Sequence, residues 1–296
     1  MFIANALRLD RARVRCAIAV GCLLAAAQPA SGATLIYGYA FTNKHLVSFF
    51  SDAPGDLVGD VAVTGLAPGD LLAGLDFRPA NGQLYSVARN GDTTQLVTID
   101  TATGVVTPVG TPQSSPNAAP FGLDFNPVAD RLHLVGSADE IDEIDPDSGV
   151  LVLIAQLQLE GSEQPSLEHL AYANSTAGAT TTTLYGIDAM RDRLVVVDTS
   201  TGGLTTIGSL GLNTSGVAIG GFDIEPGTNA AYAALQRDIS FSSLYTVDLA
   251  TGQATEVGAI GGGRLLGIAI APEPGAFASS LCALALLGWL RRRTPR

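Results

Sequence analysis

Three aspartates occupy the same local sequence and could together perform acid–base chemistry. Asp76, Asp124 and Asp223 each follow a glycine by two residues and precede a proline by three. Carboxylates that face one another raise one another's pKa, so that one can act as an acid while another acts as a base. Hydrolysis of a glycosidic bond needs two such groups. One interpretation of the chain is therefore a glycoside hydrolase with these three catalytic residues.

A structural role explains the three aspartates better. Their shared context predicts that each carboxylate accepts backbone N–H bonds from a neighbouring repeat. Weaker copies of the same segment carry Ala171 and Ala269 at the aspartate position. Sugar sites commonly stack sugar rings on aromatic faces, yet the single tryptophan, Trp289, lies in the C-terminal tail. We therefore predict a chain without catalytic residues, and the glycosidase is the alternative.

The histidines and the known catalytic motifs indicate no other reaction. His45, His133 and His169 lie in three different repeats, without a second histidine or a cysteine at metal-binding spacing. We expect each of them to be a strand or loop residue. The sequence has neither a Gly-x-Ser-x-Gly elbow nor a Gly-x-x-x-x-Gly-Lys loop, and Lys44 is its only lysine. We therefore expect no zinc, no phosphate handling and no cofactor.

A dense acidic run is the candidate for binding a hard cation. Calcium prefers several oxygen ligands, and six carboxylates crowd residues 139–147: Asp139, Glu140, Asp142, Glu143, Asp145 and Asp147. In a strand, however, successive side chains point to opposite faces, which would divide this run. No glutamate follows at the distance that an EF-hand loop requires. We predict a solvated strand edge here and assign no metal ligand.

The body of the chain is a repeat. Four apolar runs end in an aspartate that a glycine follows four residues later, and these aspartates recur at intervals of 45, 53 and 50 residues: Asp100, Asp145, Asp198 and Asp248. Aspartate can accept a hydrogen bond from the backbone two residues further on, and glycine adopts positive φ without a Cβ clash. These four aspartates are therefore predicted to form turns.

The repeat predicts the fold. Short runs rich in Val, Ile, Thr and Tyr favour strands, and each unit supplies four of them in about 48 residues, the length of a propeller blade. Four units are complete: 72–110, 120–157, 167–210 and 219–260. The fifth is split, with its innermost strand at 264–270 and its outer three at 35–40, 45–50 and 60–66. We predict an all-β, five-bladed β-propeller closed by its N-terminal strands, with a six-bladed ring as the alternative.

The predicted propeller domain, residues 34–271, is strongly acidic. It holds 26 aspartates and glutamates against 8 lysines and arginines, a net charge of about −18. This sign makes nucleic acid and anionic membrane surfaces poor partners, because binding to phosphate groups requires positive charge. All three cysteines, Cys16, Cys22 and Cys282, lie outside the domain, so it has no disulfide. A domain of this size can bury a sufficient core without one.

The N-terminal segment, residues 1–33, has the pattern of a secretory signal peptide. Four arginines lie between positions 8 and 15, the apolar stretch Cys16–Ala27 follows, and small residues stand at 31–33. This order of basic, apolar and small residues is typical of a cleaved signal helix. We expect export through the general secretory route.

The C-terminal tail, residues 272–296, carries three features in order. Pro272, Glu273 and Pro274 precede a largely apolar run at 275–290, and Arg291, Arg292 and Arg293 follow it. An apolar helix of this length spans the bilayer only marginally, and the arginines would hold its end in the cytoplasm. The tail resembles the PEP-CTERM sorting signal of Gram-negative bacteria. That resemblance implies transient anchoring in the inner membrane, processing by an exosortase-type enzyme, and a final place at the cell surface or outside the cell.

The body resembles a family of exported bacterial proteins known only as a domain of unknown function. The stretches at 124–132 and 244–252 carry the resemblance, which extends over most of residues 72–270. The family implies no reaction. We therefore expect a noncatalytic exported scaffold that binds extracellular polysaccharide or another surface protein.

Overall fold

The computed structural model describes residues 32–114, 120–136, 139–159, 165–212, 220–236 and 240–272. This part of the chain is all-β, with one short 3-10 turn at Ala189–Arg191. Within it, we find no helix that is both long and apolar enough to span a bilayer. The predicted signal peptide helix and the predicted tail helix lie outside the described residues.

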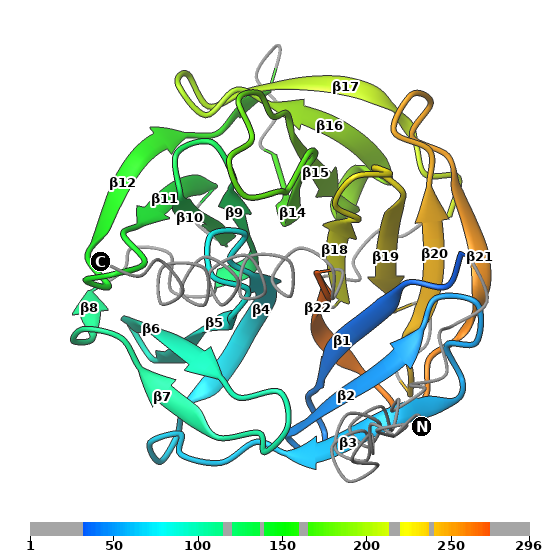
Figure 1. Ribbon diagram of the computed structural model, residues 1–296. Coiled ribbons are helices and arrows are strands. Elements are labelled where there is room, and N and C mark those ends of the chain that lie inside the picture. The colour runs from blue at the N-terminus through cyan, green and yellow to red at the C-terminus, as the bar shows by residue number, and fades with distance from the viewer. Residues whose placement is uncertain are drawn as a thin grey trace, which may run out of the picture. The chain divides into compact units, whose positions relative to one another are not determined.

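The strands of the propeller domain form five sheets, or blades, around one axis (Figure 1). Blade 1 contains, from the axis outward, β22 (Leu265–Ile270), β1 (Leu35–Ala40), β2 (His45–Phe50) and β3 (Leu57–Ala62). Blade 2 contains β4 (Leu71–Phe77), β5 (Leu84–Asn90), β6 (Thr93–Ile99) and β7 (Val106–Pro108). Blade 3 contains β9 (Pro120–Asn126), β10 (Arg131–Gly136), β11 (Glu140–Ile144) and β12 (Leu151–Gln156).

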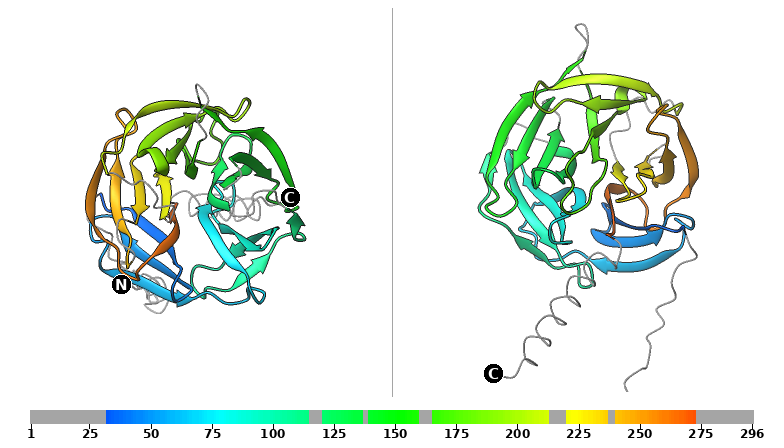
Figure 2. Two further views of the ribbon diagram at one scale, coloured as in Figure 1. Left: turned by 180° about the vertical axis from the view of Figure 1, so that it is seen from behind. Right: turned by 45° about the horizontal axis from the view of Figure 1, so that its top comes forward.

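The remaining two blades follow the same plan. Blade 4 contains β14 (Leu167–Tyr172), β15 (Leu184–Asp188), β16 (Arg193–Val197) and β17 (Gly203–Ser209). Blade 5 contains β18 (Gly220–Ile224), β19 (Ala231–Leu235), β20 (Ser243–Val247) and β21 (Ala254–Ala259). Two short strands extend this plan: β8 (Gln113–Ser114) pairs with β6, and β13 (Gln158–Leu159) pairs in parallel with β17. Figure 2 shows the same ring of blades from behind and tilted.

Blade 1 is assembled from both ends of the domain. β22 pairs antiparallel with β1, with Ile36 opposite Ile270 and Gly38 opposite Ile268. The predicted five-bladed ring with one split blade is therefore confirmed. Closure of this kind matters because an unpaired strand edge would otherwise be exposed to pairing with another chain.

One strand of the split blade was placed wrongly by the sequence pattern. The third outer strand runs over Leu57–Ala62, whereas 60–66 was expected. The chain leaves blade 1 after Val63, whose N–H still bonds to Lys44 O, and Thr64 then pairs with Val105 of blade 2. The apolar spacing continues past this crossing, so the sequence pattern alone does not mark the end of the strand.

The hydrophobic core lies between the blades. Because each blade is covered on both faces, the residues of its inner strands are buried on both sides, as are all six residues of β14. Between blades 2 and 3, the rings of Tyr85 and Phe125 meet edge to face, with centroids 5.2 Å apart. Between blades 1 and 2, Leu46 packs in one cluster with Phe77. Such contacts remove apolar surface from water and hold neighbouring blades together.

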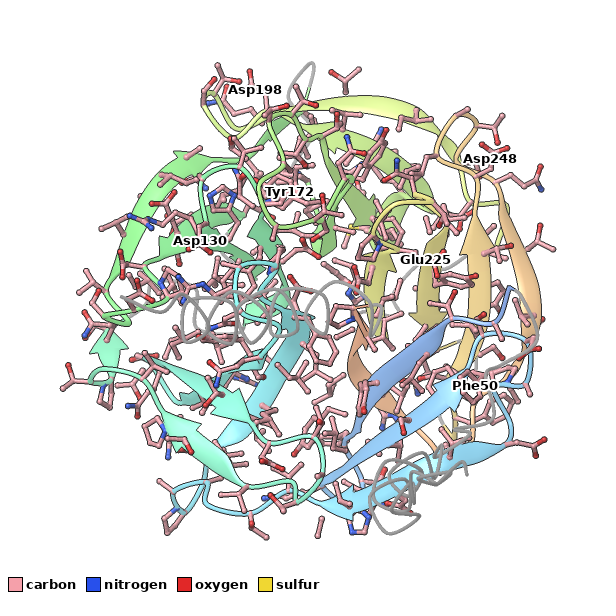
Figure 3. The ribbon with its side chains drawn as sticks, viewed as in Figure 1. Phe50, Asp130, Tyr172, Asp198, Glu225 and Asp248 are labelled. Atoms are coloured by element: carbon pink, nitrogen blue, oxygen red, sulfur yellow. The ribbon has the colours of Figure 1, made fainter. Side chains whose placement is uncertain are left out.

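The repeated aspartates form the outer turns of the blades. Asp145 Oδ1 accepts the N–H of Asp147 at 3.0 Å and that of Ser148 at 2.9 Å. The equivalent bonds occur at Asp100, Asp198 and Asp248. Figure 3 shows Asp198 and Asp248 at the periphery of the ring. The glycine that follows each of them has positive φ, as at Gly202 (75°), where a Cβ would lie only 1.8 Å from Gln156 O.

Candidate functional site

The three repeat aspartates meet at the axis of the propeller. Asp76 lies on β4, Asp124 on β9 and Asp223 on β18, the innermost strands of blades 2, 3 and 5. They are 4%, 2% and 4% exposed. One carboxylate oxygen of each lies within 4.8 Å of an oxygen of the other two. We call these three residues the axial carboxylates.

Each axial carboxylate accepts a hydrogen bond from the next blade. The bonds run from a backbone N–H to a carboxylate oxygen: Phe125 to Asp76 (2.7 Å), Tyr172 to Asp124 (3.1 Å) and Ile270 to Asp223 (2.6 Å). The innermost strand of a blade has no further strand on its axial edge, so a buried N–H there needs another acceptor. This is the interblade role that the shared sequence context predicts.

Two of the aspartates also accept an N–H bond from their own strand. Asp223 Oδ1 accepts the N–H of Ile224 at 2.6 Å, and Asp76 accepts the N–H of Phe77. In both cases the preceding blade has an alanine at the aspartate position: Ala171 before Asp223 and Ala269 before Asp76. Three carboxylates thereby provide acceptors for the equivalent N–H groups of all five inner strands.

Burial raises the pKa of every axial carboxyl group. For Asp76 and Asp124, loss of hydration is the main cause of the raised pKa, and repulsion by the neighbouring aspartates adds to it. The N–H bonds favour the charged form and oppose this rise. For Asp223, which accepts two of them, burial still raises the pKa to about 7.

The axial carboxylates have no room for a sugar. The cavity beside Asp76 and Asp223 has a volume of about 20 Å³, and Ser175 and Arg78 help to line it. A cavity of this size holds about one water molecule, whereas ligand pockets usually measure about 300–1,000 Å³. The geometry therefore does not support glycoside hydrolysis at these residues.

The axial carboxylates are also where a small cation could contact three oxygens. Among the described residues, they form the one group of at least three His, Cys, Asp or Glu side chains at ligand spacing. Calcium takes six to eight oxygen ligands. Here the carboxylates already accept the five N–H bonds, which compete with a cation for the same lone pairs. The acidic cluster alone does not select an ion.

The acidic run at 139–147 is dispersed rather than gathered. Glu143 lies 3.6 Å from Arg131, Asp145 bonds within its own turn, and Asp147 bonds to Arg78 at 2.7 Å. Asp142 is fully buried on the opposite face of β11 from Glu143. The division that strand alternation predicts is therefore present.

Arg78 joins blades 2 and 3 in a way that the sequence did not indicate. Its Nε and Nη2 donate to the two oxygens of Asp130, at 2.8 and 2.6 Å. Arg78 is 8% exposed, and the bonds hold the pKa of Asp130 below its usual range. The two residues are 52 positions apart and belong to turns of different blades, so no local signal could pair them.

Two of the three histidines contact other polar residues. His133 Nδ1 lies 2.5 Å from Tyr172 Oη, and its Nε2 lies 3.2 Å from Glu143 Oε2. Burial lowers the pKa of His133, so the ring is neutral. Tyr172, which is labelled in Figure 3, lies on blade 4 and through this contact links it to blade 3. His45 Nδ1 lies 2.5 Å from Asp60 Oδ1, within blade 1.

His169 is buried without a hydrogen-bond partner. It lies on β14 at the position where the other inner strands have glycine: Gly74, Gly122, Gly221 and Gly267. It is 1% exposed, and neither ring nitrogen has a partner among the described residues. Burial lowers the pKa of His169 to about 4, so the ring is neutral. It lines an axial cavity of about 10 Å³ at the level of these glycines.

The predicted sorting signal falls almost wholly outside the described residues. Of its six residues, only Pro272 is described, and it lines the cavity beside Asp76 and Asp223 together with Pro79 and Pro226. All three prolines occupy the same position of the repeat. Glu273, Pro274 and the three arginines, Arg291, Arg292 and Arg293, lie beyond the described part of the chain.

Blade 2 carries an open polar pocket. Its volume is about 430 Å³, and hydroxyl, amide and carboxylate groups line it: Thr98, Thr101, Thr103, Thr107, Gln83 and Asp100. We call it the threonine pocket. Thr98 and Thr107 face each other across β6 and β7. Asp100 uses Oδ1 for its turn, which leaves Oδ2 available as an acceptor. No motif in the sequence indicates this pocket.

Several solved structures are similar to this chain in fold. A protein of unknown function from Bacteroides thetaiotaomicron VPI-5482 is 16% identical, covers 83% of this chain and 69% of its own, and has a TM-score of 0.51. A nidogen/laminin complex contains a chain that is 14% identical (81% and 98% covered, TM-score 0.48). The glutaminyl cyclase of Myxococcus xanthus is 16% identical (69% and 92% covered, TM-score 0.44). The first structure supports the fold alone, and the TM-scores of the other two are below 0.5.

The sequence itself places the chain in a family. The curated proteins with which it was compared include no match. The sequence profile of a domain of unknown function matches residues 45–269, from the second strand of blade 1 to the strand that closes the ring. The chain belongs to the family described as "Domain of unknown function (DUF4394)".

Proposed function

We propose that this protein is an exported, noncatalytic propeller scaffold of the cell surface or extracellular matrix. The observation that carries the proposal is the use of the axial carboxylates. The residues best suited to catalysis are buried and accept backbone N–H bonds between blades. A rigid ring with exposed loops and pockets is suited to binding, although the fold alone names no ligand.

The partner that the surface favours is a neutral polysaccharide, bound in the threonine pocket. Its volume of about 430 Å³ lies within the usual range for ligand sites. Hydroxyl, amide and carboxylate groups can exchange hydrogen bonds with sugar hydroxyls, as donors and acceptors. The net charge of about −18 in residues 34–271 disfavours an acidic polymer. Another surface protein is the alternative partner.

Affinity electrophoresis through gels that contain the host's own extracellular polysaccharide tests this contact. The expected result is retardation of the exported protein, lost in the variants Thr98→Val and Thr107→Val. Thr246→Val is the matched control, because Thr246 and Thr255 of blade 5 form the same cross-strand pair and the same hydrogen bond as Thr98 and Thr107. Equal migration with and without polysaccharide would reject it. Reducing ends released from the polymer would instead indicate a hydrolase.

The sorting part of the proposal rests on the two ends of the sequence. We expect an exosortase-type system to process the tail after export, with transient anchoring of the apolar helix in the inner membrane. Fractionation of host cells with the full chain and with a chain that lacks residues 272–296 is the test. The full chain should reach the surface or medium, and the shortened chain should remain in the periplasm. Identical distribution of the two would contradict a sorting role for the tail.

A further inference from the structure

We propose that the axial carboxylates make the stability of the propeller ring depend on pH. In this proposal Asp76, Asp124 and Asp223 share protons at neutral pH, and alkaline pH ionises them and loosens the blades at the axis. The inference concerns the stability of the ring and does not depend on the proposed function.

The three axial carboxylates lie close together and are buried. Their oxygens lie within 4.8 Å of one another, and each residue is at least 96% buried. Full ionisation would put three like charges together where almost no water can screen them. Carboxylates in such a position share protons, because like charges so close cannot all ionise. They titrate as one coupled group.

Among the described residues, no positive charge compensates the axial carboxylates. None of the ion pairs among the described residues includes an axial carboxylate. The strand β22 contributes no titratable residue. Three titratable residues lie directly opposite the axial carboxylates on the adjacent strands: Tyr85 on β5, His133 on β10 and Tyr232 on β19. The other titratable and charged residues on the surrounding elements are Arg78 after β4, Glu168, His169 and Tyr172 on β14, and Glu225 after β18.

The residues near the cluster that could carry a positive charge either bond to other carboxylates or are neutral. The guanidinium of Arg78 bonds to Asp130 and Asp147. Burial keeps His169 and His133 neutral, since it lowers the pKa of both. Bound protons can therefore reduce the negative charge of the cluster, and no further ligand is required.

Protonation of the axial carboxylates also affects the contact between the blades. The oxygens of the cluster also accept the N–H bonds that join neighbouring inner strands, as between Asp124 and Tyr172. A protonated carboxyl group still accepts through one oxygen and donates its O–H to a neighbouring aspartate. In the ionised cluster, repulsion pushes apart the strands that these bonds hold together.

The sign of the pH effect follows from the raised pKa values. Unfolded aspartates ionise near pH 3.9, whereas the folded cluster keeps protons to higher pH, to about 7 for Asp223. The stabilisation is therefore fully present below the unfolded pKa and is lost as pH rises through the folded values. Each proton held only in the folded state makes the unfolding equilibrium constant rise about tenfold per pH unit over this interval.

Thermal unfolding of the protein in buffers on both sides of pH 7 tests this pH dependence. The melting temperature of the wild type should fall as pH rises, and Asp124→Asn should reduce this fall, because the amide keeps an acceptor for Tyr172 without a charge. Glu168→Gln is the matched control. Glu168 is also buried and has a pKa raised to about 7, but it lies outside the cluster. Glu168→Gln should reduce the pH dependence of the melting temperature less than Asp124→Asn does.

Infrared spectroscopy of Glu168→Gln provides a second measurement, because Glu168, whose pKa is also raised to about 7, would add its own band in the wild type. A band from protonated carboxylic acid should be present at neutral pH and disappear in alkaline buffer. The proposal is overturned if this band is absent, or if Asp124→Asn and the wild type show the same pH dependence. Millimolar calcium or magnesium that stabilises the wild type but not Asp124→Asn at alkaline pH would also overturn it, in favour of a bound cation.

Discussion

The backbone N–H of Ile270 donates to Asp223 at 2.6 Å, and this bond joins blade 5 to the strand that closes the ring. β22 arrives from the C-terminal end of the domain and completes a blade whose other strands are the first three of the chain. The same carboxylate also accepts the N–H of Ile224. One side chain therefore satisfies a backbone group on each side of this interface.

Replacing Asp223 should cost more stability than replacing Asp124. Asp223→Ala removes the acceptor of two buried N–H groups, whereas Asp124→Ala removes the acceptor of one, that of Tyr172. A buried donor without a partner costs about 1–3 kcal/mol. Both changes relieve the same kind of charge repulsion, so the difference between the two isolates the extra N–H. Urea unfolding measures it, and equal losses would contradict the bonding pattern described for the axis.

The ion pair between blades 2 and 3 should depend on the arginine more than on its exposed partner. Arg78→Ala removes three charge-assisted bonds and should lower the free energy of unfolding by about 2–3 kcal/mol. Asp147→Asn should cost less than about 1 kcal/mol, because the Asp147 side chain is 78% exposed and solvent screens its contact.

The pH dependence of the Arg78 contact has a definite sign. The folded pKa of Asp130 is lowered, so its contribution is present above the unfolded pKa of about 3.9 and is lost as pH falls through the folded value. Denaturant unfolding in acidic buffer, wild type against Arg78→Ala, checks both expectations. A pH-independent difference between the two proteins would count against the ion pair.

The buried imidazole of His169 should make the protein sensitive to mild acid. Its folded pKa of about 4 lies below the unfolded value of about 6.5, so the unfolded state binds a proton first as pH falls. The wild type should lose about 3 kcal/mol relative to His169→Leu over this interval. At neutral pH the variant should be at least as stable, because it removes two unpartnered nitrogens. Parallel stability curves for the two proteins between these pH values would refute this assignment.

Gly202 should tolerate alanine far less well than Gly178. Both have positive φ, 75° and 78°, which costs alanine roughly 1–2 kcal/mol. At Gly202 the added Cβ would also lie 1.8 Å from Gln156 O, whereas nothing lies within 4 Å at Gly178. We therefore expect Gly178→Ala to lower the free energy of unfolding by about that amount, and Gly202→Ala to lower it by several times as much. Similar melting temperatures for the two variants would show that the approach of the Gln156 carbonyl is not as close as described.

The sequence by itself determined the blade count, the aspartate turns and the split blade. These features are readable because their causes are local. A turn such as Asp145–Gly149 is made within five residues, and it recurs with each unit. The N-terminal strands supplied the three strands that the last unit lacks, so closure followed from counting. The end of β3 could not be predicted from the sequence, because the chain crosses to blade 2 within an unbroken apolar pattern.

Only the tertiary structure decided which distant residues meet. The sequence indicated Asp76, Asp124 and Asp223 as a set. It did not indicate that two of them accept a second N–H because the preceding blade has Ala171 or Ala269 at the aspartate position. It gave no sign of contacts such as Arg78 with Asp130 or His133 with Tyr172. Those pairs are about 40 to 50 residues apart in sequence, and the packing of one blade against the next sets their separation. A repeat specifies each blade, but only the closed ring determines which side chains of adjacent blades face each other.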